Sequence, residues 1–434
     1  MDVTRRTLLA TAGAASVGTL LASCAGFTGQ SKGSAGGGGS KSGTLTFTTW
    51  ASDTEKSAYT KLIAQFEKAN KGVTVRANFV PYQQMFTNID AQLSAGNAPD
   101  VFRVGYGQIG GYAKQGALLD LSSSLGSEKS RFIPAFWEAV SYEDKPYGVA
   151  QQTDTSAIAY NKDLTSQAGV KSFPTSLDDA WSFEEFAALL KQLRGKLPSS
   201  KFPFAYNWQL AGSPRWLNWV FAAGGRLLNE GLDKSVIVSP EGTRALDYTK
   251  AFFENKWVPT NSSVKSNAYS DTTWLAGTTA MVSAGNFLLP SFADAKFDWG
   301  VTYLPKDERG ADDLGGNALV ATKDGDNTEL ATEFLKFMVS DDAMSTFCGE
   351  ALELPTLQGL VGKDLGWDVP DGIMPVFVDQ ATTITAADVS QLAVPAASQI
   401  TTVLTDQLEA AFRQGKSTAD TLRDIAAGVD KAVA

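Results

Sequence analysis

The residues that could carry chemistry in this chain are limited by the absence of histidine. Its 434 residues include no histidine and two cysteines, Cys24 and Cys348. Without histidine the chain has no Ser-His-Asp triad, no imidazole base and no His-ligated metal, and two cysteines are too few for a zinc-thiolate cluster. The sequence therefore predicts no histidine-dependent catalytic residues, no metal site and no cofactor, and it predicts that Cys348 is a buried, unpaired thiol.

One glycine-rich segment matches a dinucleotide-binding pattern, but its surroundings do not fit. Residues 105–110, Gly-Tyr-Gly-Gln-Ile-Gly, follow a predicted strand and have the spacing G-x-G-x-x-G. The long apolar helix that should follow is missing, because Gly116 interrupts residues 111–120, and the candidate acid Asp120 does not stand at a strand end. A nucleotide site is therefore not the favoured interpretation.

The acidic residues suggest two further kinds of site, and neither has a complete motif. Asp324-Gly325-Asp326 begins like a calcium-binding loop, but position six is not glycine and position twelve is Leu335 instead of glutamate. Paired carboxylates could hydrolyse glycosides, yet no particular pair stands out. An extracytoplasmic carbohydrate-active enzyme, a lyase or glycosidase, therefore stays open as an alternative function.

The net charge argues against nucleic acid as a partner. The formal charge is −10, and removal of residues 1–23, which contain Asp2, Arg5 and Arg6, would leave 35 basic and 46 acidic residues, or −11. An acidic chain without a Lys/Arg run repels phosphate backbones.

The first 43 residues predict an exported, lipid-anchored protein. Arg5-Arg6 precede a short apolar stretch, Leu8 to Leu21, as in a twin-arginine signal peptide over residues 1–23. Leu21-Ala22-Ser23-Cys24 resembles the lipobox of bacterial lipoproteins, in which the cysteine is acylated, for example with palmitate, and becomes the new N-terminus. Residues 24–43 comprise the lipidated Cys24 and a flexible Gly/Ser linker. Because of the signal peptide and the lipobox, we expect an extracytoplasmic protein that is anchored to the outer face of the cell membrane or held in the periplasm.

The elements that position any site follow from apolar periodicity. Strands are predicted over 44–50, 73–80 and 99–104, with amphipathic helices between them that end at Gly72 and Gly96. The pattern restarts after Tyr147, and the length suits two domains. Alternation of strands and helices predicts an α/β fold with parallel strands.

From residue 44 to its end the chain resembles the family 1 extracellular solute-binding proteins, the family of maltose-binding proteins. Four segments carry the resemblance, and they occur in order along the chain. They are residues 95–101, residues 110–113 with 116–121, residues 147–149 with 159–164, and residues 277–281 with 303–305.

This resemblance implies a periplasmic-binding-protein-like type II fold, in which two α/β lobes are joined by a hinge of three crossover strands. The crossings are expected near Gln151–Asp154, Val282–Gly285 and Leu314–Asn317. The first lobe then comprises residues 44–152 plus 285–316, and the second comprises 153–284 plus 317–434. Such lobes can close on a ligand between them.

The resemblance also implies which residues bind the ligand. Sugars need aromatic platforms and planar hydrogen-bonding groups. The expected ligand-binding residues are Trp50, Ser52, Asp53, Tyr106, Gln108, Gln152, Asp154, Trp208, Asn286 and Asn317. For Trp50 and Trp208 a place in the core is the alternative, and Asp154 could instead hold the hinge.

The resemblance therefore implies the substrate-binding component of an ABC importer and not an enzyme. It would capture a sugar or small oligosaccharide as a monomer and deliver it to the membrane permease. Besides the enzyme, a receptor for a polyamine, metal chelate or anion is the remaining alternative. The expected site contains mostly amides and aromatic residues with few acids. This composition favours a neutral polyol as the ligand.

Overall fold

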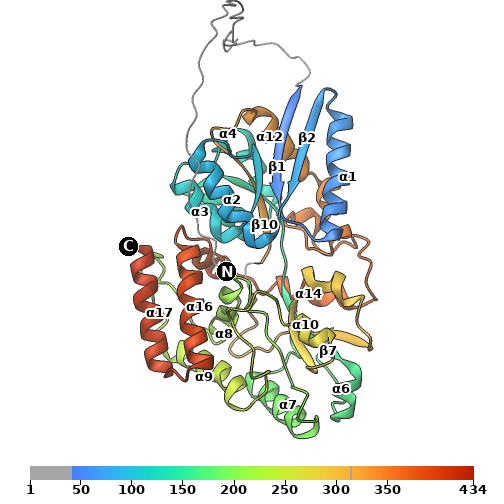
Figure 1. Cartoon of the computed structure of the whole chain (residues 1–434), viewed down its shortest axis with the longest axis vertical. Coiled ribbons are helices and arrows are strands. Elements are labelled where there is room, and N and C mark those ends of the chain that lie inside the picture. Colours follow the sequence, from blue (N-terminus) through green and yellow to red (C-terminus); the bar gives the residue numbers. More distant parts are fainter. Residues whose placement is uncertain (1–41, 313–314) are drawn as a thin grey trace, which may run out of the picture. The chain divides into compact units, whose positions relative to one another are not determined.

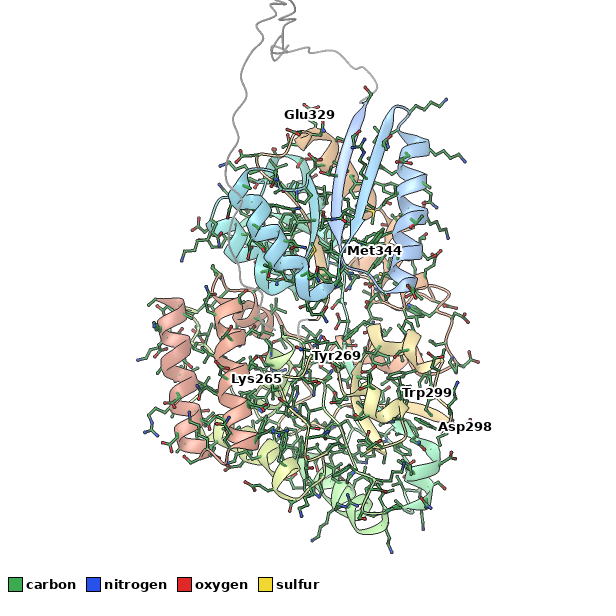
Figure 2. The ribbon with its side chains drawn as sticks, viewed as in Figure 1. Lys265, Tyr269, Asp298, Trp299, Glu329 and Met344 are labelled. Atoms are coloured by element: carbon green, nitrogen blue, oxygen red, sulfur yellow. The ribbon has the colours of Figure 1, made fainter. Side chains whose placement is uncertain are left out.

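The structure, a computed structural model, describes residues 42–312 and 315–434 (Figure 1). The predicted signal peptide, the lipidation site at Cys24 and nearly all of the linker lie outside these residues. The described part contains two main β-sheets with separate apolar cores. Figure 2 shows the side chains that fill these cores, with Met344 in the first and Trp299 on a strand of the second sheet.

The first sheet has five strands in the order β2-β1-β3-β10-β6. Strand β1 pairs in parallel with β2 and β3, as predicted, whereas β10 is antiparallel to both β3 and β6. The strands are β1 (Gly43–Thr49), β2 (Val73–Phe79), β3 (Val101–Gly105), β6 (Gly148–Gln152) and β10 (Asn317–Ala321). The helices of this part are α1 (Asp53–Ala69), α2 (Tyr82–Ala95), α3 (Tyr106–Lys114), α4 (Ser122–Leu125), α5 (Pro134–Ala139), α12 (Thr328–Met338) and α13 (Asp341–Ala351).

Helix α1 shows how the sequence builds this part. Ser52 and Glu55 form a capping box that satisfies free amides at its start. Tyr59, Leu62 and Phe66 recur at helical spacing and are buried against the sheet and α13. Helix α2 ends at Gly96, whose φ of 70° is the left-handed cap conformation that favours glycine.

The second sheet has three strands in the order β8-β7-β9, all antiparallel. They are β7 (Ser156–Asn161), β8 (Met281–Gly285) and β9 (Trp299–Thr302), while β4 (Ser141–Tyr142) and β5 (Lys145–Pro146) form a separate hairpin. The helices of the second part are α6 (Lys162–Gln167), α7 (Phe183–Lys196), α8 (Leu217–Ala222), α9 (Pro240–Glu254), α10 (Asp271–Leu275), α11 (Leu289–Phe292), α14 (Ile373–Ala381), α16 (Ala397–Arg413) and α17 (Thr418–Val433). Helix α15 (Ala386–Leu392) contacts both parts, because its Val389 lies in the first core beside α5 and its Gln391 accepts a hydrogen bond from the Leu227 amide. Trp216, Trp219, Phe221 and Trp274 are core residues.

The chain passes between the two sheets where two of the three crossings were predicted. It leaves the first sheet after Gln152 and enters β7 at Ser156. It returns between β9 and Asn317, the first residue of β10. The crossing predicted at Val282–Gly285 is wrong, because all of β8 pairs with β7 inside the second sheet. The third passage lies instead between Leu360, in the first core, and Ile373, in the second part.

The predicted lobe boundaries are wrong in consequence. Residues 285–316, assigned to the first lobe, contain β9 of the second sheet. Residues 317–434, assigned to the second lobe, begin with β10, α12 and α13, whose apolar side chains fill the first core. An apolar strand such as β10 fits either sheet by its pattern, and only its hydrogen-bond partners decide which sheet it joins.

One prediction about chemistry can be compared with the described residues. Cys348 is buried and free, as predicted. Within 42–312 and 315–434, no group of three or more Cys, Asp or Glu side chains could hold a metal ion. No helix in the same residues is long and apolar enough to cross a membrane.

Candidate ligand-binding site

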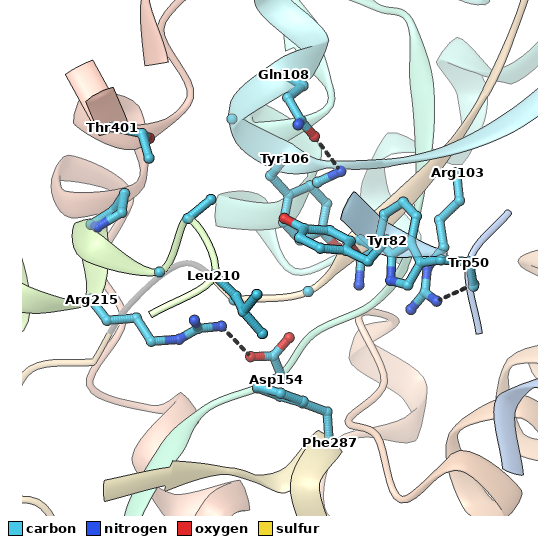
Figure 3. Close-up of a pocket in the computed structure, with 18 of the residues that line it drawn as sticks. Trp50, Tyr82, Arg103, Tyr106, Gln108, Asp154, Leu210, Arg215, Phe287 and Thr401 are labelled. Carbon is cyan, nitrogen blue, oxygen red and sulfur yellow. Dashed lines mark hydrogen bonds and ion pairs between the residues drawn. The ribbon is translucent and has the colours of Figure 1, made fainter. Parts of the chain in front are cut away.

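A pocket of about 710 Å³ lies where the two sheets are joined, and its size suits a small-molecule ligand (Figure 3). Trp50 follows β1, Val80 follows β2 and Tyr106 follows β3, and all three line the pocket. Because β1, β2 and β3 run parallel, their carboxyl ends meet at one edge of the sheet, where ligands of open α/β sheets bind.

Arg103 organises the wall on the side of the first sheet. Its guanidinium donates from Nη2 to Oε1 of Glu55 at 2.6 Å and from Nη1 to the carbonyl of Trp50 at 3.1 Å. It also lies 4.6 Å from the centre of the Trp50 ring, a cation–π contact. Burial is the largest single influence on the pKa of Arg103 and lowers it, but Glu55, Tyr59 and Glu353 together raise the pKa above its ordinary value.

Trp50 is thereby held in one orientation between the arginine and two further rings. Its ring centre lies 5.2 Å from that of Tyr82 and 5.7 Å from that of Phe86, both edge to face. Burial raises the pKa of Tyr82 to about 12. The rings of Trp50 and Tyr82 therefore give the first part an aromatic wall beside the Arg103–Glu55 pair.

Arg215 has a corresponding place on the side of the second sheet. Its Nη2 lies 3.7 Å from Oδ1 of Asp154, on the crossing segment (Figure 3). Its guanidinium also lies 5.4 Å from the ring centre of Phe287 and 5.8 Å from that of Tyr269. The pocket thus contains two arginines, each next to an acid and to aromatic rings.

A strained loop completes this second wall. Leu210 and Ala211 line the pocket and have φ angles of 53° and 62°, in the left-handed region that non-glycine residues rarely adopt. Strain of this kind costs about 1–3 kcal/mol per residue and is concentrated at functional sites.

Six of the ten predicted ligand-binding residues line the pocket, and their contact with a ligand stays a prediction. They are Trp50, Ser52, Tyr106, Gln108, Asp154 and Asn317. With its amide oxygen facing donors, Asn317 accepts hydrogen bonds from Gln152 Nε2 at 2.9 Å and from Arg103 Nη2 at 3.0 Å. Asn317 therefore links β10 to the arginine that orients Trp50.

Three predicted residues, Asp53, Gln152 and Asn286, are not among the residues that line the pocket. Asp53 is the exposed first residue of α1. Gln152 is buried, and its carbonyl accepts a 2.7 Å hydrogen bond from the Tyr106 hydroxyl. Asn286 is buried and accepts from the Thr155 amide at 2.8 Å. The last two therefore support the pocket from behind.

The prediction for Trp208 is wrong, because its ring belongs to the core. It is 2% exposed and stacks on Tyr206 at 4.3 Å and near Phe412 at 5.4 Å between ring centres. Phe412 comes from α16, about 200 residues later, and no local pattern around residue 208 announces that contact.

The sequence interpretation missed most of the aromatic and charged lining. The residues it did not name are Glu55, Tyr82, Arg103, Arg215, Tyr269, Phe287 and Glu353. A charged residue within the apolar strand 101–104 was a usable signal for Arg103, since a buried charge must be paired. Tyr269 and Phe287 lie in irregular or one-turn segments, which have no periodicity to interpret.

Comparison with known proteins supports this architecture. Residues 50–345 match the sequence model of the family described as bacterial extracellular solute-binding protein. The maltodextrin-binding protein MdxE of Bacillus subtilis is 29% identical over 331 residues, which are 73% of this chain and 74% of that protein. A maltooligosaccharide ABC transporter solute-binding lipoprotein of Streptococcus pneumoniae is 25% identical over 277 residues, 60% of each chain.

A solved structure has the same fold. An ABC substrate-binding protein from Listeria monocytogenes, in complex with cycloalternan, superposes with a TM-score of 0.76 at 22% identity, over 90% of this chain and 99% of that one. The predicted periplasmic-binding-protein type of α/β fold is therefore confirmed.

Proposed function

Because the chain belongs to the bacterial extracellular solute-binding protein family, we propose that its pocket captures a neutral sugar or small oligosaccharide for an ABC importer. Membership in a family of solute-binding proteins confirms the prediction of a binding protein in place of an enzyme. The identity of the solute is the part that we propose.

One observation carries the sugar assignment, namely aromatic rings on both walls of a pocket with paired charges. Trp50 and Tyr82 stand on one wall, and Tyr269 and Phe287 stand on the other. Sugar rings present apolar C–H faces that pack on aromatic rings, and their hydroxyls need polar partners such as Asp154. The names of the maltodextrin-binding and maltooligosaccharide-binding relatives agree with this chemistry.

The charges of the pocket disfavour the other receptor hypotheses. Glu55 is paired with Arg103, and Asp154 lies near Arg215. The positive charge of each arginine is therefore already compensated by an acid of the pocket, which disfavours an anionic ligand. A polyamine would need several acids without internal partners. The two walls come from parts of the chain joined by crossover segments, which supports closure of the lobes on the ligand.

Thermal-shift assays can test the assignment with maltotriose, cycloalternan, mannotriose and N,N′-diacetylchitobiose, together with galacturonate and spermidine as charged controls. We expect at least one neutral sugar to raise the melting temperature and to be recovered intact after incubation. Stabilisation by a charged control alone, or conversion of the sugar, would contradict the proposal.

We also propose an export and anchoring route for this protein. Residues 1–23 would act as a twin-arginine signal peptide, and Cys24 would carry the acyl chains, palmitate among them. The lipobox and the lipoprotein relative in Streptococcus pneumoniae support this route. The anchored monomer would then present its ligand to the permease subunits of the importer.

A further inference from the structure

Glu353 differs from the other two acids of the pocket. Glu55 and Asp154 each lie within 4 Å of an arginine nitrogen, whereas no ion pair of Glu353 is found within the described residues. Glu353 is 1% exposed and nevertheless lines the pocket. A buried carboxyl without a cation needs another explanation, because burying an uncompensated charge is expensive.

Hydrogen bonds on both sides of Glu353 hold its backbone in place. Its amide donates to the Cys348 carbonyl at 2.9 Å, and its own carbonyl accepts from Nε1 of Trp367 at 3.1 Å. The next residue, Leu354, exchanges two hydrogen bonds with Thr153 on the crossing segment, at 2.9 Å and 3.0 Å. These bonds fix the backbone position from which the Glu353 side chain reaches the pocket.

Asn286 determines which oxygen of the carboxyl can carry a proton. The orientation of its amide is fixed, because its oxygen accepts from the Thr155 amide at 2.8 Å and its nitrogen donates to the Leu352 carbonyl at 2.8 Å. The same nitrogen donates to Oε2 of Glu353 at 2.8 Å. Oε2 is thus an acceptor, which leaves Oε1 as the oxygen that can bear hydrogen.

We propose that Glu353 contacts the bound ligand as a hydrogen-bond donor and selects ligands that offer a hydroxyl or carbonyl oxygen to it. The proposal rests on the proposed function of this pocket and specifies one of its contacts. Asn286, predicted as a ligand contact, acts instead as the residue that positions Glu353.

The electrostatic surroundings agree with a neutral carboxyl. Burial, followed by repulsion from Asp154 and Glu55, raises the pKa of Glu353 well above its ordinary value, while Arg103 acts in the opposite direction. The titratable groups that interact with it from neighbouring elements are Glu55, Arg103, Tyr106, Cys348 and Asp154. If Glu353 is neutral, the remaining charges of the pocket are two acids that each lie near an arginine. These charges compensate one another, which suits an uncharged ligand.

Infrared spectroscopy of the unliganded protein tests the protonation directly. At pH 7 we expect a protonated-carboxyl C=O band in the wild type that is lost in Glu353→Gln and retained in Glu350→Gln, a matched change at a half-buried residue of α13 that is paired with Lys61. Absence of that band from the wild type would overturn the proposal whether or not any sugar binds. Failure of every sugar in the thermal-shift assay would instead contradict the proposed function.

Calorimetry with maltotriose tests the contact. We expect Glu353→Met to weaken binding about tenfold or more, because a ligand oxygen loses its donor, and Glu353→Gln, whose amide retains a donor, to recover most of the affinity. The wild-type affinity should fall as the pH rises through the pKa of Glu353, and that of Glu353→Gln should not. Equal pH profiles for the two proteins, or a carboxyl band that saturating maltotriose leaves unshifted, would show that Glu353 does not contact the sugar.

Discussion

Nη2 of Arg103 lies 2.6 Å from Oε1 of Glu55, and both side chains are nearly excluded from solvent behind the Trp50 ring. This pair connects strand β3 to the first turn of α1 and sets the position of the aromatic wall. It gives the pocket a side on which the buried charges compensate one another.

Breaking this ion pair should destabilise the protein. Glu55→Gln leaves the buried guanidinium of Arg103 without its carboxylate, so we expect the free energy of unfolding to fall by about 3–5 kcal/mol. Urea denaturation measures it, with Glu138→Gln as the control, because Glu138 belongs to an exposed pair with Lys129. A loss no larger than that of the control would show that the pair contributes little.

Trp50 and Trp208 should respond in opposite ways to replacement by alanine. Trp50→Ala removes a ring of the pocket wall and should weaken sugar binding about thirtyfold. Trp208→Ala opens a cavity in the core and should lower the free energy of unfolding by about 3–5 kcal/mol. Calorimetry and thermal melting of both variants distinguish the two roles. A large loss of stability for Trp50→Ala with unchanged affinity would show that Trp50 is a core residue and not a ligand contact.

Gly316, on the segment that leads into β10, should not tolerate a side chain. Its φ is 99°, and an added Cβ would lie 2.5 Å from both the Gln152 carbonyl oxygen and the Thr153 Cα. We expect Gly316→Ala to lower the free energy of unfolding by about 2–4 kcal/mol. Gly359→Ala is the matched control, because its Cβ would meet no heavy atom within 4 Å. Equal melting temperatures for the two variants would contradict the close packing of the crossing.

The stability of the protein should depend on pH through Glu353. Because its pKa is raised in the folded state, the folded protein holds a proton that the unfolded chain releases above about pH 4.3. This contribution is complete below the unfolded pKa and is lost as the pH rises through the folded pKa. Relative to Glu353→Gln, the wild type should lose up to about 1.4 kcal/mol per pH unit in that window. Parallel stability curves between pH 4 and 8 would show that the carboxyl is not protonated.

Cys24 should be required for membrane attachment. Cys24→Ser removes the only side-chain sulfur in the lipobox, so we expect the protein to move from the membrane fraction to the medium or periplasm. Cell fractionation and immunoblotting measure this, and Ser23→Ala serves as the neighbouring control. Retention of Cys24→Ser in the membrane fraction would refute acylation at this residue.

The sequence by itself determined the local elements and the kind of fold. The periodicity of Tyr59, Leu62 and Phe66 and the capping residue Ser52 define α1, because local hydrogen bonds and one buried face are enough to form a helix. The order of the family segments along the chain led to the solute-binding family. Trp50 and Asp154 could be predicted to lie near the pocket, because both follow strands whose position in the fold is implied by the family resemblance.

Only the tertiary structure decided the division of the lobes and the second wall of the pocket. Strand β10 has the same apolar pattern whichever sheet it joins, and its hydrogen bonds to β3 and β6 place it in the first. Trp208 is buried by Phe412 from a distant helix, whereas Phe287 remains at the pocket beside Arg215. An aromatic residue has the same local sequence signal in a core and in a binding site. Contacts from residues far along the chain decide between the two, because burial depends on everything that packs around the ring.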